Sequence, residues 1–208
     1  PFMGITGPNG ELELYDGNLR VIDASGNRMV DQFPCTQYSQ LIQEQVKSWS
    51  YMKFPFLTAL GSEQGWYRVG PLARINLCSF ISTPLAEQAR QVFRSETGAP
   101  SHSPLAFHWA RMIEALHCAE AIALLLDDPD LLSHDLQRSG IKRKEGIGVI
   151  EAPRGTLFHH YRIDDQDRVE MANLIVSTTS NNQAMNETIR AVAAQHLDGQ
   201  QLTPELLN

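Results

Sequence analysis

Cysteine is scarce in this sequence, and the few cysteines are scattered. The 208 residues include 3 cysteines, Cys35, Cys78 and Cys118. An odd number without a C-x-x-C pair argues against a disulfide framework and favours a reducing compartment, so we predict a cytoplasmic location. Each cysteine is expected to pack as a small apolar side chain.

Basic clusters and long apolar runs are missing as well. The net charge of −7 and the sequence pI near 5.5 argue against nucleic acid or an anionic membrane surface as a partner. No apolar run approaches the roughly 20 residues that cross a bilayer. Hydrophobic residues make up 42% of the chain and charged residues 20%, which suits a globular protein. We take residues 1–208 as a single domain, with two small domains as the alternative.

The chain's most informative stretch contains two strand-like runs. Residues 156–163 and 169–177 are rich in branched and aromatic side chains, and four turn formers, residues 164–167, separate them. Runs of strand length around a polar corner predict a β-hairpin.

Arg154 lies on a constrained loop just before the first of these runs. Pro153 fixes its own φ and pushes Ala152 into an extended conformation, and Gly155 permits a positive φ or a close backbone approach. One interpretation is a structural arginine that pairs with Glu151 or with an aspartate of the turn. The other is a fixed cation that points into a closed site, where its charge has a larger effect than in water.

A polar run, residues 177–182, follows the second strand directly. In a regular hairpin this run lies near the Arg154 loop. Alternatively it is a loop in which Asn181 or Asn182 caps a helix over residues 183–197. The apolar residues expected to face inward from this helix are Met185, Ile189, Val192 and Ala193.

Hydrophobic periodicity places the other elements. Alternation over residues 11–34 predicts a small β-meander, and helical spacing predicts a helix from Thr36 or Ser39 to about Trp49. Two further helices are predicted, over residues 84–97 and from Ser103 to about Leu126. The inward stripe of the latter is expected to comprise Leu105, Trp109, Met112, Ile113, Leu116, Ala119 and Ala123. Gly98 and Gly199 are read as helix ends, and Thr203 as the start of another helix. The predicted fold class is α+β, with a helix-rich core and small antiparallel sheets.

Histidines offer little support for a metal site. His108, Glu114 and His117 share one predicted helix, but nine residues separate the histidines, which is not the i, i+4 spacing of a ligand pair. We therefore read them as packed or surface side chains. His159 and His160 of the hairpin are open to two roles, hydrogen bonding within the sheet or proton transfer.

Three words of the sequence resemble the large subunit of nickel–iron hydrogenases: E-A-P-R-G-T-L-F-H-H-Y at residues 151–161, N-L-I-V-S-T-T-S-N-N at 173–182 and G-P-L-A-R at 70–74. The His-His-Tyr ending is similar to that of the cytoplasmic, cofactor-coupled type. The resemblance implies a nickel–iron centre with carbon monoxide and cyanide ligands. It also implies reversible oxidation of H2, with electrons passed towards NAD(P).

The resemblance implies roles for five residues in the wall of that centre. Arg154 matches the arginine whose guanidinium overhangs the open position between the metals. Ala152 and Pro153 match contacts around the diatomic ligands of the iron. Val176 and Thr178 match the opposite side of the pocket, where the Thr178 hydroxyl would donate a hydrogen bond to a cyanide.

Other parts of the implied machinery are not in this sequence. In the family, four cysteine thiolates from two C-x-x-C pairs hold the metals, and this chain has neither pair. We therefore expect an internal fragment of a longer large subunit, inactive and free of the nickel–iron centre on its own. Leu174 matches a residue whose backbone carbonyl binds Mg²⁺. The implied partners are diaphorase subunits together with an iron–sulfur small subunit.

Two other classes of protein remain as alternatives. The quinone-module subunit of respiratory complex I shares the scaffold without the metal and carries an E-x-P-R-G word. Its word usually has Ser before the Pro and lacks His-His-Tyr, which favours the hydrogenase. A non-catalytic interaction module is the second alternative.

Overall fold

The structure is a computed structural model that describes residues 1–137 and 139–197. Small antiparallel sheets and longer helices alternate along the chain, which confirms the α+β prediction. The first sheet comprises β1 (Phe2–Thr6), β2 (Asn18–Ile22) and β3 (Arg28–Phe33). The second comprises β4 (Ile42–Gln45) and β5 (Phe54–Leu57), and the third β6 (Glu145–Ala152), β7 (Gly155–Ile163) and β8 (Val169–Ile175).

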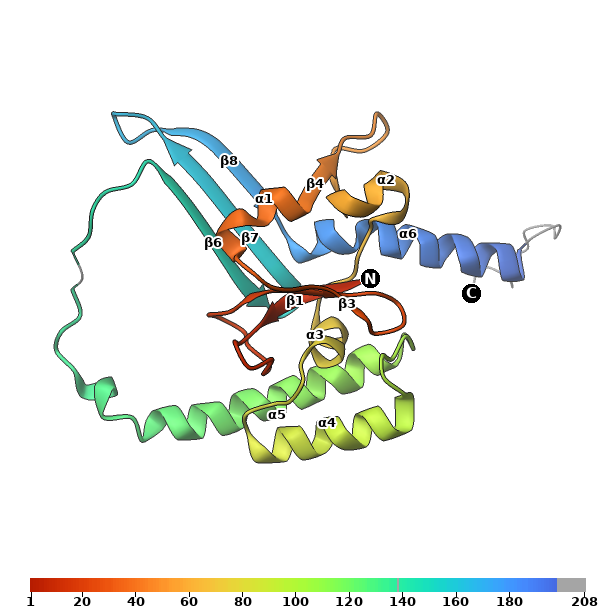
Figure 1. Cartoon of the computed structure of the whole chain (residues 1–208), viewed down its shortest axis with the longest axis horizontal. Coiled ribbons are helices and arrows are strands. Elements are labelled where there is room, and N and C mark those ends of the chain that lie inside the picture. Colours follow the sequence, from red (N-terminus) through yellow and green to blue (C-terminus); the bar gives the residue numbers. More distant parts are fainter. Residues whose placement is uncertain (138, 198–208) are drawn as a thin grey trace.

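One helix packs against the first sheet, and another begins directly after the last strand of the third sheet. The longer helices are α3 (Pro71–Leu77), α4 (Pro84–Thr97), α5 (Ala106–Leu126) and α6 (Ser177–His196). The short ones are α1 (Tyr38–Leu41), α2 (Gly61–Gln64) and 3-10 turns at Cys35–Gln37, Thr58–Leu60 and Pro129–Leu132. Helix α3 packs against β1 and α5, and α4 lies beside α5 (Figure 1). No helix in the described ranges is long and apolar enough to cross a membrane.

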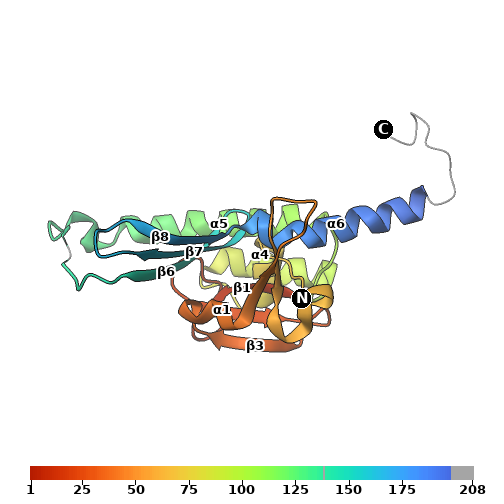
Figure 2. The same ribbon diagram turned by 90° about the horizontal axis from the view of Figure 1, so that it is seen from above.

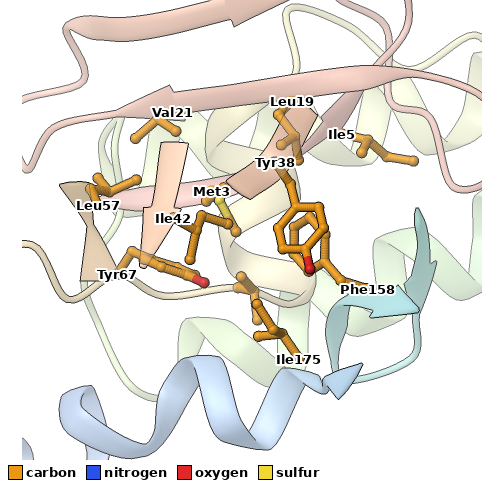
Figure 3. Close-up of a cluster of buried hydrophobic side chains, with 11 residues drawn as sticks. Met3, Ile5, Leu19, Val21, Tyr38, Ile42, Leu57, Tyr67, Phe158 and Ile175 are labelled. Atoms are coloured by element: carbon orange, nitrogen blue, oxygen red, sulfur yellow. The ribbon is translucent and has the colours of Figure 1, made fainter. Parts of the chain in front are cut away.

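The third sheet projects from the body of the molecule, and α6 runs from the end of β8 towards the other side (Figures 1 and 2). One end of the sheet is therefore anchored and the other is distal. The anchored end contributes Phe158 and Ile175 to the hydrophobic core, where Figure 3 shows them beside Tyr38. The rest of this cluster comes mainly from the first two sheets: Met3, Ile5, Leu19, Val21, Ile42, Leu57, Tyr67 and Val69.

The N-terminal predictions hold in part. The β-meander is confirmed as a three-stranded sheet, but its first strand is β1 rather than the segment around Leu12, which makes only isolated bridges, from Leu12 to Thr6 and from Glu11 to Phe80. The helix predicted from Thr36 to Trp49 is wrong. A single helical turn gives way to β4, because pairing with β5 places Ile42 in the core and overrides the helical spacing.

The helix predicted over residues 84–97 is confirmed as α4, and Gly98 ends it with a φ of +80°. Helix α5 ends at Leu126 as predicted but begins at Ala106, and its predicted inward stripe is largely wrong. Leu105 and Met112 are 80% and 62% exposed. The buried positions of α5 are Ala106, Ala110, Ile113 and Glu114, since small alanines allow close packing and Glu114 meets a buried arginine.

The C-terminal hairpin is confirmed as β7 and β8, while strand β6, which pairs with β7 on its other side, was not predicted. Helix α6 starts at Ser177, so the prediction that Asn181 or Asn182 caps it is wrong. Met185, Ile189 and Val192 are exposed, and the buried residues of α6 are Ser177, Ser180 and Ala184. The predictions at Gly199 and Thr203 fall outside the described residues.

Only one cysteine packs as predicted. Cys78 is buried, Cys35 is half-buried and Cys118 is exposed. Burial raises the pKa of Cys35 to about 11 and that of Cys78 to about 12, so both are neutral thiols at physiological pH.

Candidate functional site

Arg154 lies in a tight turn between β6 and β7. Ala152 pairs with Gly155, and Pro153 and Arg154 form the corner; we call residues 152–155 the Arg154 turn. Gly155 has a φ of +133°, and a Cβ there would lie 2.3 Å from Val69 Cγ2 and 2.8 Å from the Gly70 nitrogen. The positive φ and the close approach expected of this glycine are thus both present.

A second glycine meets the turn from the other side. Gly70 has a φ of +115°, and a Cβ there would lie 3.0 Å from the carbonyl oxygen of Arg154. The backbones of G-P-L-A-R and A-P-R-G therefore pack against each other without an intervening side chain. The position of the Arg154 turn is fixed by the backbone of Val69 and Gly70.

Arg74, from the same word, fixes the turn a second time. Its Nη1 donates to Glu151 Oε2 at 2.6 Å and to the carbonyl oxygen of Ala152 at 3.1 Å. On its other side, Nε and Nη2 donate to the two carboxylate oxygens of Glu114 on α5, at 2.5 and 2.7 Å. The Arg74 side chain is only 2% exposed, and a planar guanidinium fork suits this two-point contact.

Glu151 is the buried acceptor of this cluster. Its Oε1 accepts hydrogen bonds from the Ile5 amide at 2.9 Å and from the Thr156 hydroxyl at 2.8 Å. Burial raises the pKa of Glu151 against the opposing effect of Arg74 and the N–H and O–H donors. Burial would lower the pKa of Arg74, but Glu114 and Glu151 more than offset this and raise it.

The interpretation of Arg154 as a structural partner of Glu151 is therefore wrong. The partner of Glu151 is Arg74, and within residues 1–137 and 139–197 the exposed Arg154 guanidinium makes no ion pair. Sequence reasoning missed Arg74, Glu114 and Glu151 as a unit. The signals available were the arginine of the G-P-L-A-R motif and the glutamate that begins the E-A-P-R-G motif.

The other predicted wall begins where β8 ends. Phe158 pairs with Ile175, so the antiparallel register brings Val176 and Thr178 to the same end of the sheet as the Arg154 turn. Asn181 Oδ1 accepts from the Val69 amide at 2.9 Å, and its Nδ2 donates to the Val69 carbonyl at 3.2 Å. The segment at Val69 and Gly70 thus contacts both walls.

The predicted wall residues differ in exposure. Arg154, Pro153 and Thr178 are exposed, Ala152 is half-buried and Val176 is 40% exposed. An arginine and a hydroxyl at one end of a sheet, each on backbone anchored to the same segment, can present a cation and a hydrogen-bond donor to a bound group.

A hollow of about 330 Å³ lies beside the turn. Its lining comprises Leu14, Arg74, Arg111, Glu114, Ala115, Cys118, Glu151, Ala152 and Pro153. Cys118 is the one cysteine there, and a single thiol is not a ligand set. Among the residues that the structure describes, no group of three His, Cys, Asp or Glu could hold a metal. The residues around this hollow could line a bound group.

Leu174 and the hairpin histidines lie further along the sheet. Leu174 pairs with His159 and lines a hollow of about 370 Å³ that also contacts Thr179. His160 lies 2.7 Å from Glu145 Oε1 and 3.0 Å from the Tyr38 hydroxyl, and His159 lies 2.9 Å from the Tyr161 hydroxyl. These contacts support hydrogen-bonding roles for both histidines.

The histidines of α5 have ordinary surroundings. His117 Nδ1 lies 2.9 Å from the Thr83 hydroxyl, and burial lowers the pKa of His117. Glu114 is engaged by Arg74, and His108 is exposed.

Comparison with known proteins identifies the family. The model of the nickel-dependent hydrogenase family matches residues 20–199. The chain belongs to the nickel-dependent hydrogenase family. The three words that carry the resemblance lie within the matched residues.

Two relatives of this chain are themselves named hydrogenases. The chain is 44% identical to the NAD-reducing hydrogenase HoxS subunit beta of Cupriavidus necator, over 99% of this chain and 43% of the relative. It is 37% identical to an F420-non-reducing hydrogenase of Methanococcus voltae, over 96% of this chain and 43% of the relative.

The fold is also that of a solved hydrogenase chain. A crystal structure of an NAD⁺-reducing [NiFe]-hydrogenase in the H2-reduced state matches with a TM-score of 0.92 and 48% identity, over 99% of this chain and 46% of that one. The chain described here therefore spans less than half the length of these relatives.

Proposed function

We propose that this chain is part of the catalytic large subunit of a nickel–iron hydrogenase that reversibly oxidises H2 and passes electrons towards NAD(P). The observation that carries the proposal is the double fixation of the Arg154 turn. Backbone contact with Gly70 and hydrogen bonds from Arg74 hold the turn, while the Arg154 guanidinium itself stays unpaired among the described residues. The backbone that carries this cation is held in place, and its side chain is available to a bound substrate instead of stabilising the fold.

Each wall residue has a proposed role. Arg154 supplies a fixed positive charge beside the reacting hydrogen. Ala152 and Pro153 form the apolar and backbone contacts around diatomic ligands of the iron, carbon monoxide and cyanide. Val176 closes the opposite side, and the Thr178 hydroxyl donates a hydrogen bond to a cyanide. When bound, the nickel–iron centre supplies the redox chemistry, and its thiolate ligands come from outside this chain.

The assembly follows the same proposal. Residues 1–208 act as a single domain within the large subunit, in the cytoplasm, beside diaphorase subunits and the iron–sulfur small subunit. The Leu174 backbone carbonyl is a ligand of a Mg²⁺ ion whose other ligands lie elsewhere. Support comes from the relatives, one of which is a subunit of an NAD-reducing hydrogenase.

Substitution of Arg154 by Lys in the complete enzyme tests the catalytic role. Lysine keeps the charge but loses the planar fork and the rigid placement. Turnover per bound nickel should fall on the order of 10²-fold, the effect of losing one preorganised electrostatic group. Nickel content should stay at the wild-type level, because arginine is not a ligand.

The matched control is Arg162→Lys, at the distal end of β7, the strand that follows the Arg154 turn; this arginine is exposed, and its Nε lies 3.6 Å from Glu170 Oε2. It should leave turnover and nickel content unchanged. If Arg154→Lys instead lowers nickel loading while turnover per nickel atom stays normal, Arg154 has a structural role and the catalytic proposal is wrong.

A further inference from the structure

We infer that Arg74 is a positioning residue that holds the Arg154 turn in register with helix α5, and so sets where the Arg154 guanidinium lies. The inference rests on the proposed function for its effect on turnover. The placement of the turn itself depends only on contacts within this chain.

The α5 side of this contact is rigid. Glu114 lies near the middle of a helix of 21 residues and is buried beside Ile113. Its two carboxylate oxygens accept from Nε and Nη2 of Arg74, so the guanidinium plane cannot rotate without breaking one of these bonds. The position of Glu114 on α5 therefore sets the orientation of the Arg74 guanidinium.

On the turn side, Arg74 contacts backbone as well as side chain. Nη1 reaches the carbonyl of Ala152, the residue directly before Pro153, at 3.1 Å. The same nitrogen donates to Glu151, which in turn accepts from the Ile5 amide of β1. One guanidinium thus joins α5, the first sheet and the entrance of the Arg154 turn.

A structural role alone does not require this arrangement. Arg20 is equally buried, 3% exposed, with Asp31 Oδ1 at 2.7 Å from Nε and the Leu77 carbonyl at 2.9 Å from Nη1. Arg20 thus joins the first sheet to the end of α3 through a carboxylate and a backbone carbonyl, and none of its contacts reaches residues 151–155. The two arginines are alike in burial, but Arg74 contacts two buried carboxylates and Arg20 only one that is not buried, and they differ in what they hold.

The test compares Arg74→Lys with Arg20→Lys in the complete, nickel-loaded enzyme. Lysine at 74 keeps the charge but cannot bridge Glu114 and the Ala152 carbonyl together. Turnover per bound nickel should fall at least about tenfold in Arg74→Lys, since small misplacement of a catalytic group is costly. Arg20→Lys should stay near the wild-type value.

Two readouts separate positioning from general destabilisation. Amide hydrogen exchange in peptides covering residues 150–158 should rise on the order of tenfold in Arg74→Lys, the factor for losing one hydrogen bond to a charged group. In Arg20→Lys the rise should be confined to the first sheet. The infrared bands of iron-bound carbon monoxide and cyanide should shift in Arg74→Lys alone.

If Arg74→Lys fails to fold, Glu114→Asp takes its place, because a carboxylate drawn back by one methylene pulls Arg74 away from Ala152. Unchanged exchange at residues 150–158 in the folded variant overturns the inference, as does an equal effect of Arg20→Lys there. A wild-type enzyme without nickel would refute the proposed function, and the exchange measurement would still decide the role of Arg74.

Discussion

Gly155 should be the least replaceable glycine of the hairpin. Substitution by Ala adds a Cβ that would lie 2.3 Å from Val69 Cγ2 and 2.8 Å from the Gly70 nitrogen. The backbone also holds a φ of +133°, which an L side chain rarely adopts. Neither problem can be relieved by a flexible side chain, because the nearest atoms belong to a β-branched residue and to backbone.

The expected cost is the sum of two parts. A non-glycine residue at positive φ costs about 1–2 kcal/mol, and overpacking a filled site costs about 1–3 kcal/mol. Gly155→Ala should therefore lower the free energy of unfolding by about 2–5 kcal/mol. The assay is urea denaturation followed by tryptophan fluorescence, with the slope m checked for constancy.

Substitutions at two other glycines allow the backbone cost and the overpacking cost to be measured separately. Gly98 has a φ of +80° with nothing within 4 Å of the added Cβ, so Gly98→Ala should cost only the backbone part. Gly148 in β6 also has nothing within 4 Å and no positive φ, so Gly148→Ala should be neutral or slightly stabilising.

A partial suppressor is available as well. Val69→Ala removes Cγ2 but leaves the Cβ of residue 69, so the double variant should recover part of the loss and reveal a direct coupling. If Gly155→Ala costs no more than Gly98→Ala, the backbone of the turn is not packed against Gly70 as described. The explanation for how Arg154 is placed would then be refuted.

Two further predictions concern the second wall and helix α5. Asn181→Ala should destabilise the protein by about 2–3 kcal/mol, because it leaves the buried amide and carbonyl of Val69 without partners; Asn182→Ala, which loses one exposed bond to the Lys53 carbonyl, should cost at most about 1 kcal/mol in the same denaturation assay. Because burial lowers the pKa of His117, the unfolded chain binds more protons below the ordinary value of 6.5, and stability should fall as pH drops from 6.5 through the folded-state pKa. His117→Asn should flatten that slope between pH 7.5 and 5.5 in urea midpoints, with exposed His108→Asn as the control, and an unchanged slope in His117→Asn would contradict the assignment.

Local signals in the sequence predicted the elements that local interactions determine. Helix α4 has a proline at its first turn and a glycine at its end, and both of its ends are confirmed. The β7–β8 hairpin follows from branched residues around an aspartate-rich corner. In both cases the residues that mark the ends or the turn lie within or next to the element, so the sequence carries the information directly.

Elements determined by distant partners were predicted poorly. Residues 42–45 have helical spacing, yet pairing with β5 makes them a strand. The first turn of α6 resembles a loop in the sequence, because polar residues such as Asn181 look like caps. The Asn181 side chain instead satisfies the backbone of Val69, which no local pattern announces.

The candidate site shows the same division. The rigid Arg154 turn follows from Pro153 and Gly155 alone, and the structure bears out both features. The pairing of Arg74 with Glu114 and Glu151 depends on residues 40 and 77 positions away along the chain. With several acidic residues available to each arginine, charge alone could not select these partners.

Because of these long sequence separations, the parts of the site are synthesised at different times during translation. Val69 is joined to Asn181 across 112 positions, and Ile5 to Glu151 across 146. At about 5–20 residues per second, translation needs roughly 6 to 22 seconds to pass from Val69 to Asn181, a gap of 112 residues. While synthesis passes from residue 77 to residue 151, the nascent chain holds the first sheet and α3, and neither wall has been made. The walls are therefore among the last parts of this chain to find their partners on the ribosome.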